Sequence, residues 1–201
     1  MSLKDSFSNP KGAAGRLILT GMNLGHSPMA KWGLSQIEIP QKANILDIGC
    51  GGGYNIKRFL EACPQGHVSG VDISEESVRK SKSVNRIELG RRCDIRQGNV
   101  EQLPFEDAAF DLATAFETVY FWPDPAENFK EVRRVLKEGG RFAVINDAGD
   151  PDKHWEEKIP GMKAYSPEQI ASFMEGAGFS DIRITKKRHM FCVNGKAEKH
   201  V

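Results

Sequence analysis

Short apolar runs rich in β-branched residues alternate with longer amphipathic segments along most of the chain. This alternation is typical of a parallel sheet whose strands are joined by helices. The last two runs are separated too briefly for a crossover helix, so these two strands should lie antiparallel. The predicted strands are Asn44–Ile48, His67–Asp72, Cys93–Gln97, Phe110–Phe116, Arg141–Asn146, Asp181–Lys186 and His189–Val193.

Two of the predicted helices share a start signal: an N-cap residue, a proline and then a capping-box Glu or Gln, with a glycine as the expected stop. The residues are Asp124, Pro125, Glu127 and Gly139 in the first helix and Ser166, Pro167, Gln169 and Gly178 in the second. Weaker patterns predict one helix that begins near Ile56 and another, following Ser74, over Val78–Leu89.

The first forty residues differ from the rest of the chain. They carry several glycines and then a short helix, begun by Ser27 and Pro28, that turns Met29 and Trp32 to one side. We interpret residues 1–40 as an N-terminal helical lid over the mouth of a core that spans residues 41–201. The whole chain, residues 1–201, is then expected to form a single domain.

The composition favours a cytoplasmic globular protein. With 39% hydrophobic residues among 201, the chain can bury one core, and a formal charge of +1 creates no overall field that would attract nucleic acid or an anionic membrane. We predict no membrane span, signal peptide or nucleic-acid partner. Neither zinc nor disulfides are expected, because the cysteines are widely spaced and should be small buried hydrophobes. They are Cys50, Cys63, Cys93 and Cys192.

The first strand ends in the glycine-rich sequence GCGGG, residues 49–53. A glycine turn between a strand and a helix presents free backbone N–H groups to a ligand and allows the ligand to approach the main chain closely. Dinucleotides and other adenosine compounds both use such turns. The dinucleotide fingerprint G-x-G-x-x-G fails here, because Tyr54 or Ile56 would occupy its third glycine position.

Two polar positions after later strands sharpen this interpretation. Asp72 ends the second strand, about 20 residues beyond the glycines, where an acid can accept hydrogen bonds from both ribose hydroxyls. Its alternative role is a favourable charge at the start of the next helix. Asn99 and Val100 follow the third strand, where the Asn99 amide and the Val100 N–H can reach an adenine edge. Taken alone, Gly98 and Asn99 indicate only a turn.

The segments ILDIGCGGGY, VDIS, GNVEQLPFEDAAFDLATAFETVYFWPD and LKEGGRFAVIND occur in the order and spacing of the class I S-adenosylmethionine-dependent methyltransferases. The chain most resembles the small-molecule branch that includes the ubiquinone and menaquinone C-methyltransferases. The resemblance is strong over 41–146, moderate over 165–184 and hardly reaches the first forty residues. It implies an α/β, Rossmann-like, doubly wound sheet of seven strands with the last strand antiparallel and helices on both faces.

The resemblance also implies S-adenosylmethionine as cofactor. It places the glycines near the methionine moiety, Asp47 near its amino end, Asp72 on the ribose and Asn99 with Val100 on the adenine. Asn99 stands where the family often has Asp, a change that should preserve contact with the adenine amino group. The full cofactor-binding set implied is Asp47, Gly49, Cys50, Gly51, Gly53, Asp72, Ile73, Asn99, Val100, Phe116 and Glu117.

Methyl transfer depends mainly on alignment, and a base is needed only when the acceptor must lose a proton. The catalytic candidates are His26, Glu117, Tyr120 and His154. Other residues expected around the acceptor are Met22, Asn23, Trp32, Phe121, Trp122, Trp155 and Tyr165. Aromatic rings there would stabilise a cationic methyl group. Packing is an equal alternative for the three aromatic residues at 120–122, and a structural role is an alternative for both histidines. No H-E-x-x-H pattern occurs, so no metal is expected.

The predicted function is methyl transfer to a small, apolar or aromatic molecule. One alternative is a non-catalytic S-adenosylmethionine-binding module that regulates a partner. Another is a nicotinamide-dependent oxidoreductase, which Tyr54 and the adenine loop disfavour.

Overall fold

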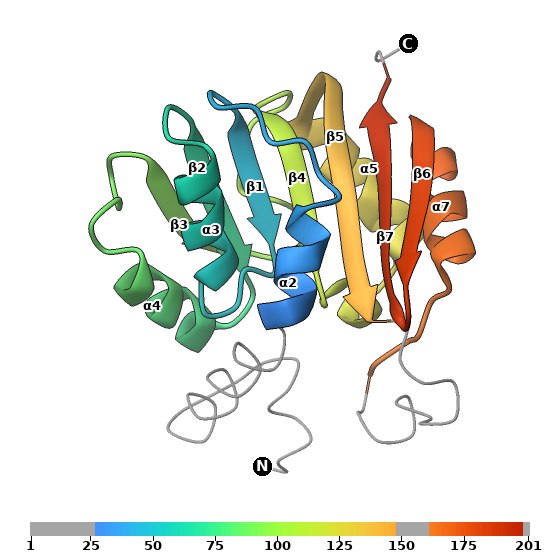
Figure 1. Ribbon diagram of the computed structural model, residues 1–201, viewed down its shortest axis with the longest axis horizontal. Helices are drawn as coiled ribbons and strands as arrows, with labels where there is room; N and C mark the ends of the chain where they lie inside the picture. Colours follow the sequence, from blue (N-terminus) through green and yellow to red (C-terminus); the bar gives the residue numbers. More distant parts are fainter. Residues whose placement is uncertain (1–26, 148–160, 199–201) are drawn as a thin grey trace.

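The computed structural model describes residues 27–147 and 161–198 (Figure 1). Within these residues a seven-stranded sheet has the order β3-β2-β1-β4-β5-β7-β6. Neighbouring strands from β3 to β5 are parallel, and β7 is antiparallel to both β5 and β6. The strands are β1 (Asn44–Ile48), β2 (His67–Asp72), β3 (Cys93–Gln97), β4 (Phe110–Phe116), β5 (Leu136–Asp147), β6 (Phe179–Lys187) and β7 (Met190–Ala197). The predicted fold class is confirmed, including the antiparallel last strand.

Helices cover both faces of this sheet (Figure 1). The helices α2 (Ser27–Leu34), α3 (Tyr54–Ala62) and α4 (Glu75–Val84) lie on one face, and α5 (Pro125–Val135) and α7 (Pro167–Gly176) lie on the other. None of the helices in the described ranges is long and apolar enough to span a membrane. Each face therefore buries its own apolar layer between sheet and helices.

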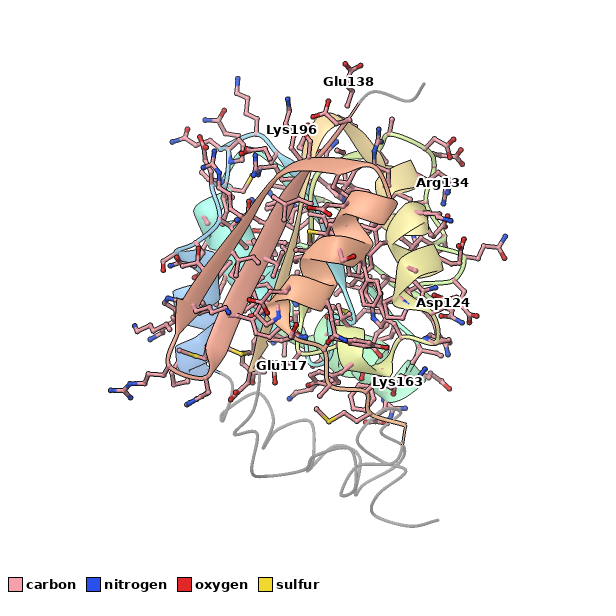
Figure 2. All side chains as sticks on the ribbon, turned by 90° about the vertical axis from the view of Figure 1, so that its right-hand side faces the viewer. Glu117, Asp124, Arg134, Glu138, Lys163 and Lys196 are labelled. Carbon is pink, nitrogen blue, oxygen red and sulfur yellow. The ribbon has the colours of Figure 1, made fainter. Side chains whose placement is uncertain are left out.

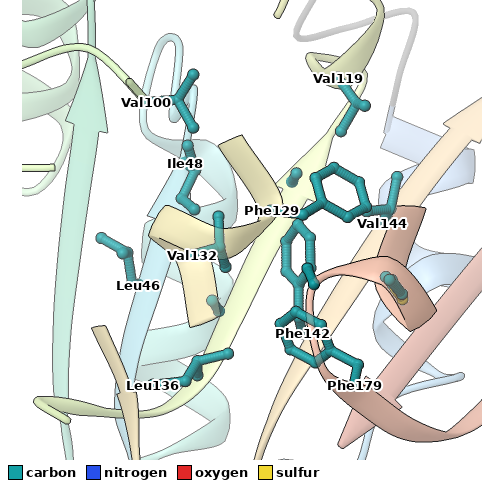
Figure 3. Packing of buried hydrophobic residues seen from close by; sticks show 14 of the residues in the cluster. Leu46, Ile48, Val100, Val119, Phe129, Val132, Leu136, Phe142, Val144 and Phe179 are labelled. Atoms are coloured by element: carbon teal, nitrogen blue, oxygen red, sulfur yellow. The ribbon is translucent and has the colours of Figure 1, made fainter. Parts of the chain in front are cut away.

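The layer beneath α5 and α7 is built on aromatic contacts (Figure 3). The Phe129 ring of α5 meets Phe142 of β5 edge-on, with ring centroids 5.1 Å apart, and both side chains are fully buried. Edge-to-face pairs of this kind add roughly 0.5–1.5 kcal/mol beyond the area they bury. This layer holds the ends of β4 and β5 in place, and the candidate site lies at those ends.

Two predicted helix ends were wrong. The α5 helix ends at Val135 instead of Gly139, because its last carbonyls accept the N–H groups of Ala108 and Ala109 and the chain passes directly into β5. The α4 helix ends at Val84 instead of Leu89.

The capping box predicted at α5 was also wrong. The Asp124 carboxylate accepts the N–H groups of Ala126 and Glu127 as an N-cap should, but the Asp124 N–H donates to Asn128 Oδ1. The Glu127 carboxylate pairs instead with Lys130 at 2.6 Å. The capping box predicted at α7 is confirmed, because the side chains and N–H groups of Ser166 and Gln169 are bonded reciprocally.

The short helix predicted after Ser27 is present as α2 and packs closely on the sheet. A Cβ added at Gly33 would come within 3.0 Å of Phe116 Cε1. Met29 and Ala30 are buried in the same layer. Residues 1–26, which carry the remainder of the predicted lid, lie outside the described residues, so the lid stays a prediction.

Candidate functional site

The predicted cofactor residues converge at the edge of the sheet where the parallel strands end. The glycine turn, residues 49–53, follows β1; Asp72 ends β2, and Glu117 follows β4. This is the lower edge in Figure 1, and Figure 2 shows Glu117 there. Doubly wound sheets bind their ligands outside this edge.

Asp72 is fixed by two backbone donors. Its Oδ2 accepts the Gly51 N–H at 2.8 Å, and its Oδ1 accepts the Ser74 N–H at 2.9 Å at the start of α4. Burial raises the pKa of Asp72, while the Ser74 and Gly51 N–H groups act in the opposite direction. The Ser77 side chain also hydrogen-bonds to this carboxyl, so a lone pair is left for a ribose hydroxyl on one of its oxygens. The ribose role and the role at the helix start are therefore compatible.

Gly49 and Gly51 in the glycine turn differ in the space around their backbone. Gly49 has φ +73° and lies against the protein itself, since an added Cβ would come 2.9 Å from Thr118 Cβ. Gly51 also has a positive φ, +50°, but an added Cβ would meet no atom within 4 Å. Of these two glycines, only Gly51, which donates its N–H to Asp72, has open space in place of a side chain. This open backbone beside a fixed carboxylate fits the sugar and methionine portions of an adenosine cofactor.

Asn85 is a supporting residue that sequence reasoning missed. Its Nδ2 donates to the carbonyls of Gly53 and Ser81, each at 2.9 Å. This amide therefore ties the glycine turn to α4 and ends that helix. No local sequence signal could have identified it, because its partner Gly53 lies 32 positions away.

Asp47 lies beneath the glycine turn and is 2% exposed. Its Oδ1 accepts the Thr114 hydroxyl at 2.8 Å across the β1–β4 pair. Burial raises the pKa of Asp47 to about 7, the Thr114 bond lowers it, and the nearby Asp72 raises it further. The structure thus joins Asp47 to β4 and places its carboxyl within electrostatic range of Asp72. Cys50 is buried in the same turn, and the expectation that all four cysteines are buried is confirmed.

The predicted adenine residues lie in the loop after β3. The Asn99 Oδ1 accepts the Glu101 N–H at 3.2 Å, and its Nδ2 donates to the Glu101 carboxylate. An adenine edge would have to replace that carboxylate. In the described part of the chain the Val100 N–H has no hydrogen-bond partner. Ile73, next to Asp72, is 51% exposed, so it offers apolar surface beside the ribose position.

Glu117 extends the β4–β5 pairing with its side chain. Its N–H donates to the Ile145 carbonyl at 2.9 Å, as in a regular parallel ladder, but its φ of +55° turns the chain away. The Glu117 carboxyl then accepts the Asp147 N–H and the Tyr120 hydroxyl, the latter at 3.3 Å. Burial raises the pKa of Glu117 to about 8; the Asp147 N–H and the Tyr120 hydroxyl lower it, and the Asp147 charge raises it. Two catalytic candidates, the partly buried Glu117 and the buried Tyr120, thus form one hydrogen-bonded pair, in which burial favours the neutral form of the Glu117 carboxyl.

Replacing Glu117 by glutamine should change how stability depends on pH. The Glu117 pKa rises from 4.5 in the unfolded chain to about 8 in the folded protein, so its ionisation opposes folding between these values. The stability of Glu117→Gln relative to wild type should therefore grow with pH over this range, at most by about 1.4 kcal/mol per pH unit, and level off above pH 8. Urea unfolding from pH 4 to 9 measures this.

The exposed Glu106→Gln is the matched control for that series, and its difference from wild type should stay flat. A flat difference for Glu117→Gln as well would show that the Glu117 carboxyl is ionised in the native protein. Ionisation of Asp47 also makes the free energy of unfolding depend on pH. This effect is common to the wild type and both variants, so it cancels when their stabilities are compared.

The aromatic residues after β4 divide between core and site. Trp122 is 5% exposed, stacks on Phe142 and donates its Nε1 hydrogen to Thr118 Oγ1 at 3.3 Å, so it is a packing residue. Tyr120 presents its hydroxyl to Glu117, and the partly exposed Phe121 lies edge-on to the Tyr120 ring. Tyr120 and Phe121 thus remain beside the candidate acceptor position.

The other predicted aromatic residues within the described ranges pack against protein side chains. Phe116 packs edge-on against Phe59 under α2 and α3, and Trp32 is partly buried in the same layer. Tyr165 packs against Phe173 of α7. Several predicted acceptor residues lie outside the described residues: Met22, Asn23, His26, His154 and Trp155. Among residues 27–147 and 161–198 no group of His, Cys, Asp or Glu side chains is placed to hold a metal ion.

Known proteins that are similar to this chain include several methyltransferases. The family model described as a methyltransferase domain matches residues 46–144. The uncharacterized methyltransferase YdaC of Bacillus subtilis is 28% identical over 157 residues, which cover 78% of this chain and 82% of YdaC. Demethylmenaquinone methyltransferase of Listeria welshimeri is 32% identical over 140 residues, 69% of this chain but only 56% of that relative. The chain thus spans about half the length of the quinone enzyme.

The same fold is found in a crystal structure of an S-adenosylmethionine-dependent methyltransferase from Aquifex aeolicus. The two chains superpose with a TM-score of 0.73 and are 20% identical, and the match covers 89% of this chain and 96% of the Aquifex chain. At this identity the likeness concerns the fold.

Proposed function

The chain belongs to the S-adenosylmethionine-dependent methyltransferases, and from this membership we propose that it methylates a small, apolar or aromatic molecule. The observation that carries the proposal is the uncharged Glu117–Tyr120 pair at the sheet edge, next to the glycine turn and Asp72. An acceptor position lined by a neutral carboxyl and aromatic rings suits an apolar molecule better than a charged one.

The residues at this edge of the sheet would bind either the methyl donor or the methyl acceptor. S-adenosylmethionine, when bound, supplies a methyl group activated by its sulfonium charge. Asp72 would hold the ribose, and Gly51 leaves the backbone open beside it. The Val100 N–H and the exposed Ile73 would contact the adenine. These assignments follow from the position of each group at the edge, and they are our proposal for the cofactor-binding set.

Glu117 is the catalytic candidate that the described residues favour. When protonated, its carboxyl can donate a hydrogen bond that orients an acceptor. When ionised, near and above pH 8, it can take the proton of an acidic hydroxyl or carbon. The Tyr120 hydroxyl holds the carboxyl in position for both tasks. The relative that acts on demethylmenaquinone supports an aromatic, apolar acceptor.

Transfer of tritium from labelled S-adenosylmethionine tests the proposal. Purified protein is incubated with 2-naphthol, a reduced naphthoquinone or a sterol, and separately with glycine or bulk transfer RNA, and extracted product is counted. We expect label in at least one apolar acceptor and none in glycine or RNA. Tight binding of S-adenosylhomocysteine without transfer to any of them would favour the non-catalytic module instead.

A further inference from the structure

Asn146 carries a buried polar atom that the protein itself does not satisfy. The residue is 3% exposed at the end of β5, and its Oδ1 has no hydrogen-bond partner. Buried side-chain oxygens are nearly always paired, because leaving one unpaired costs the full desolvation of the group. Such an atom in the described part of the chain therefore needs an explanation.

The comparison with Asn85 shows that Asn146 is the unusual residue of the two. Asn85 Oδ1 is also buried and unpaired, but its Nδ2 makes the two bonds that tie Gly53 to α4. The Asn85 amide therefore has a structural role, although its oxygen remains unpaired. For Asn146, no hydrogen bond to a described residue gives the side chain a comparable structural task.

Asn146 lies between the two β5 residues that Glu117 contacts. The Glu117 N–H is bonded to the Ile145 carbonyl, and the Glu117 carboxyl accepts the Asp147 N–H. Alternation along β5 places Asn146 on the same face as Val144, in the layer that also contains Val119 (Figure 3). The amide is thus at the carboxyl edge of the sheet, on the side of the loop that carries Tyr120.

We infer that Asn146 recognises the methyl acceptor through a hydrogen bond from an acceptor hydroxyl or amino group to its Oδ1. The inference rests on the proposed function and narrows its substrate class: the acceptor is apolar but carries one neutral hydrogen-bond donor near the reacting end. A buried amide rejects analogues that lack the donor, because the amide is then left unpaired. Asn146 acts as a specificity residue and takes no part in the transfer step.

Thermal unfolding without any ligand is the first test. Leucine has nearly the shape of asparagine and no polar atoms, so Asn146→Leu should melt at or above the wild-type temperature, by up to about 10 °C. The control Asn85→Leu should melt lower, because it removes the two side-chain hydrogen bonds that tie the Gly53 carbonyl to α4. A melting temperature for Asn146→Leu several degrees below wild type would overturn the inference, since the oxygen would then have a protein partner.

Binding of a matched pair of probes is the second test. Calorimetry with S-adenosylhomocysteine present compares 2-naphthol with 2-methoxynaphthalene, which lacks the donor hydrogen. We expect the wild type to prefer 2-naphthol at least tenfold, and Asn146→Leu to lose that preference while binding S-adenosylhomocysteine normally. An unchanged preference in the variant, or none in the wild type, overturns the inference. The proposed function is judged separately, by tritium transfer to any apolar acceptor.

Discussion

Replacing Asp72 by asparagine should weaken binding of S-adenosylhomocysteine by about 100-fold. The carboxylate is hydrogen-bonded by the N–H groups of Gly51 and Ser74 and by the Ser77 side chain, and it keeps a lone pair for a ribose hydroxyl. Asparagine replaces one of the carboxylate oxygens with an NH₂ group, which cannot accept a hydrogen bond and would face a backbone donor. Losing hydrogen bonds to a charged acceptor costs about 1.5–3 kcal/mol each, so a loss near 3 kcal/mol is expected. Calorimetry at pH 7.5 measures it.

Asp94→Asn is the control for the change of charge. Asp94 lies in β3 and pairs with His67 at 3.2 Å, away from the glycine turn. Its replacement removes the same formal charge and should leave the affinity within about twofold of wild type, because this partly exposed side chain contacts His67 and lies away from the glycine turn. If Asp72→Asn also stays within twofold, Asp72 serves only the start of α4, and the ribose assignment fails.

Much of the fold could be predicted from the sequence, because the strand limits coincide with changes of composition. The strands β1 to β4 begin and end where we predicted them, since each apolar run is bounded by polar or glycine residues. The start of β5 was missed. Leu136 pairs with Phe110 of β4 while Gly139 lies inside the strand, and the glycine that suggested a helix stop is a bend within the strand.

The sequence also predicted which residues meet at the edge of the sheet, but it could not predict how they are held. Glu117 faces Asp147 only because its backbone adopts a positive φ that no motif specifies. The close approach of Thr118 accounts for the lack of a side chain at Gly49, and the hydrogen bond from Asn85 fixes the position of Gly53. Both contacts join segments that are distant in the sequence. Such contacts depend on the packing of whole elements, and local propensity does not contain that information.

These contacts between distant segments change the interpretation of the glycine turn. The sequence suggested that all the glycines serve a ligand, yet Gly49 has a close protein neighbour and therefore a structural reason to lack a side chain. Gly51 has none, so it is the position at which a methyl group tests the ligand without disturbing the protein.

Gly51→Ala should therefore separate cofactor binding from stability. The change imposes a positive φ of +50° on alanine, which costs about 1–2 kcal/mol of stability, and no protein atom lies within 4 Å of the new methyl group. The methyl group would occupy the space next to Asp72 where the cofactor approaches. We expect the affinity for S-adenosylhomocysteine to fall at least tenfold, roughly 1.4 kcal/mol or more.

Gly90→Ala provides a matched control, because Gly90 also has a positive φ, +69°, and open space around an added Cβ. Both variants should lose similar stability in urea, while only Gly51→Ala should lose affinity in calorimetry. Gly49→Ala should lose the most stability, because its methyl group would collide with Thr118, and its affinity therefore cannot be interpreted in the same way. Equal affinities for Gly51→Ala and Gly90→Ala would mean that the open space at Gly51 is not where the cofactor lies.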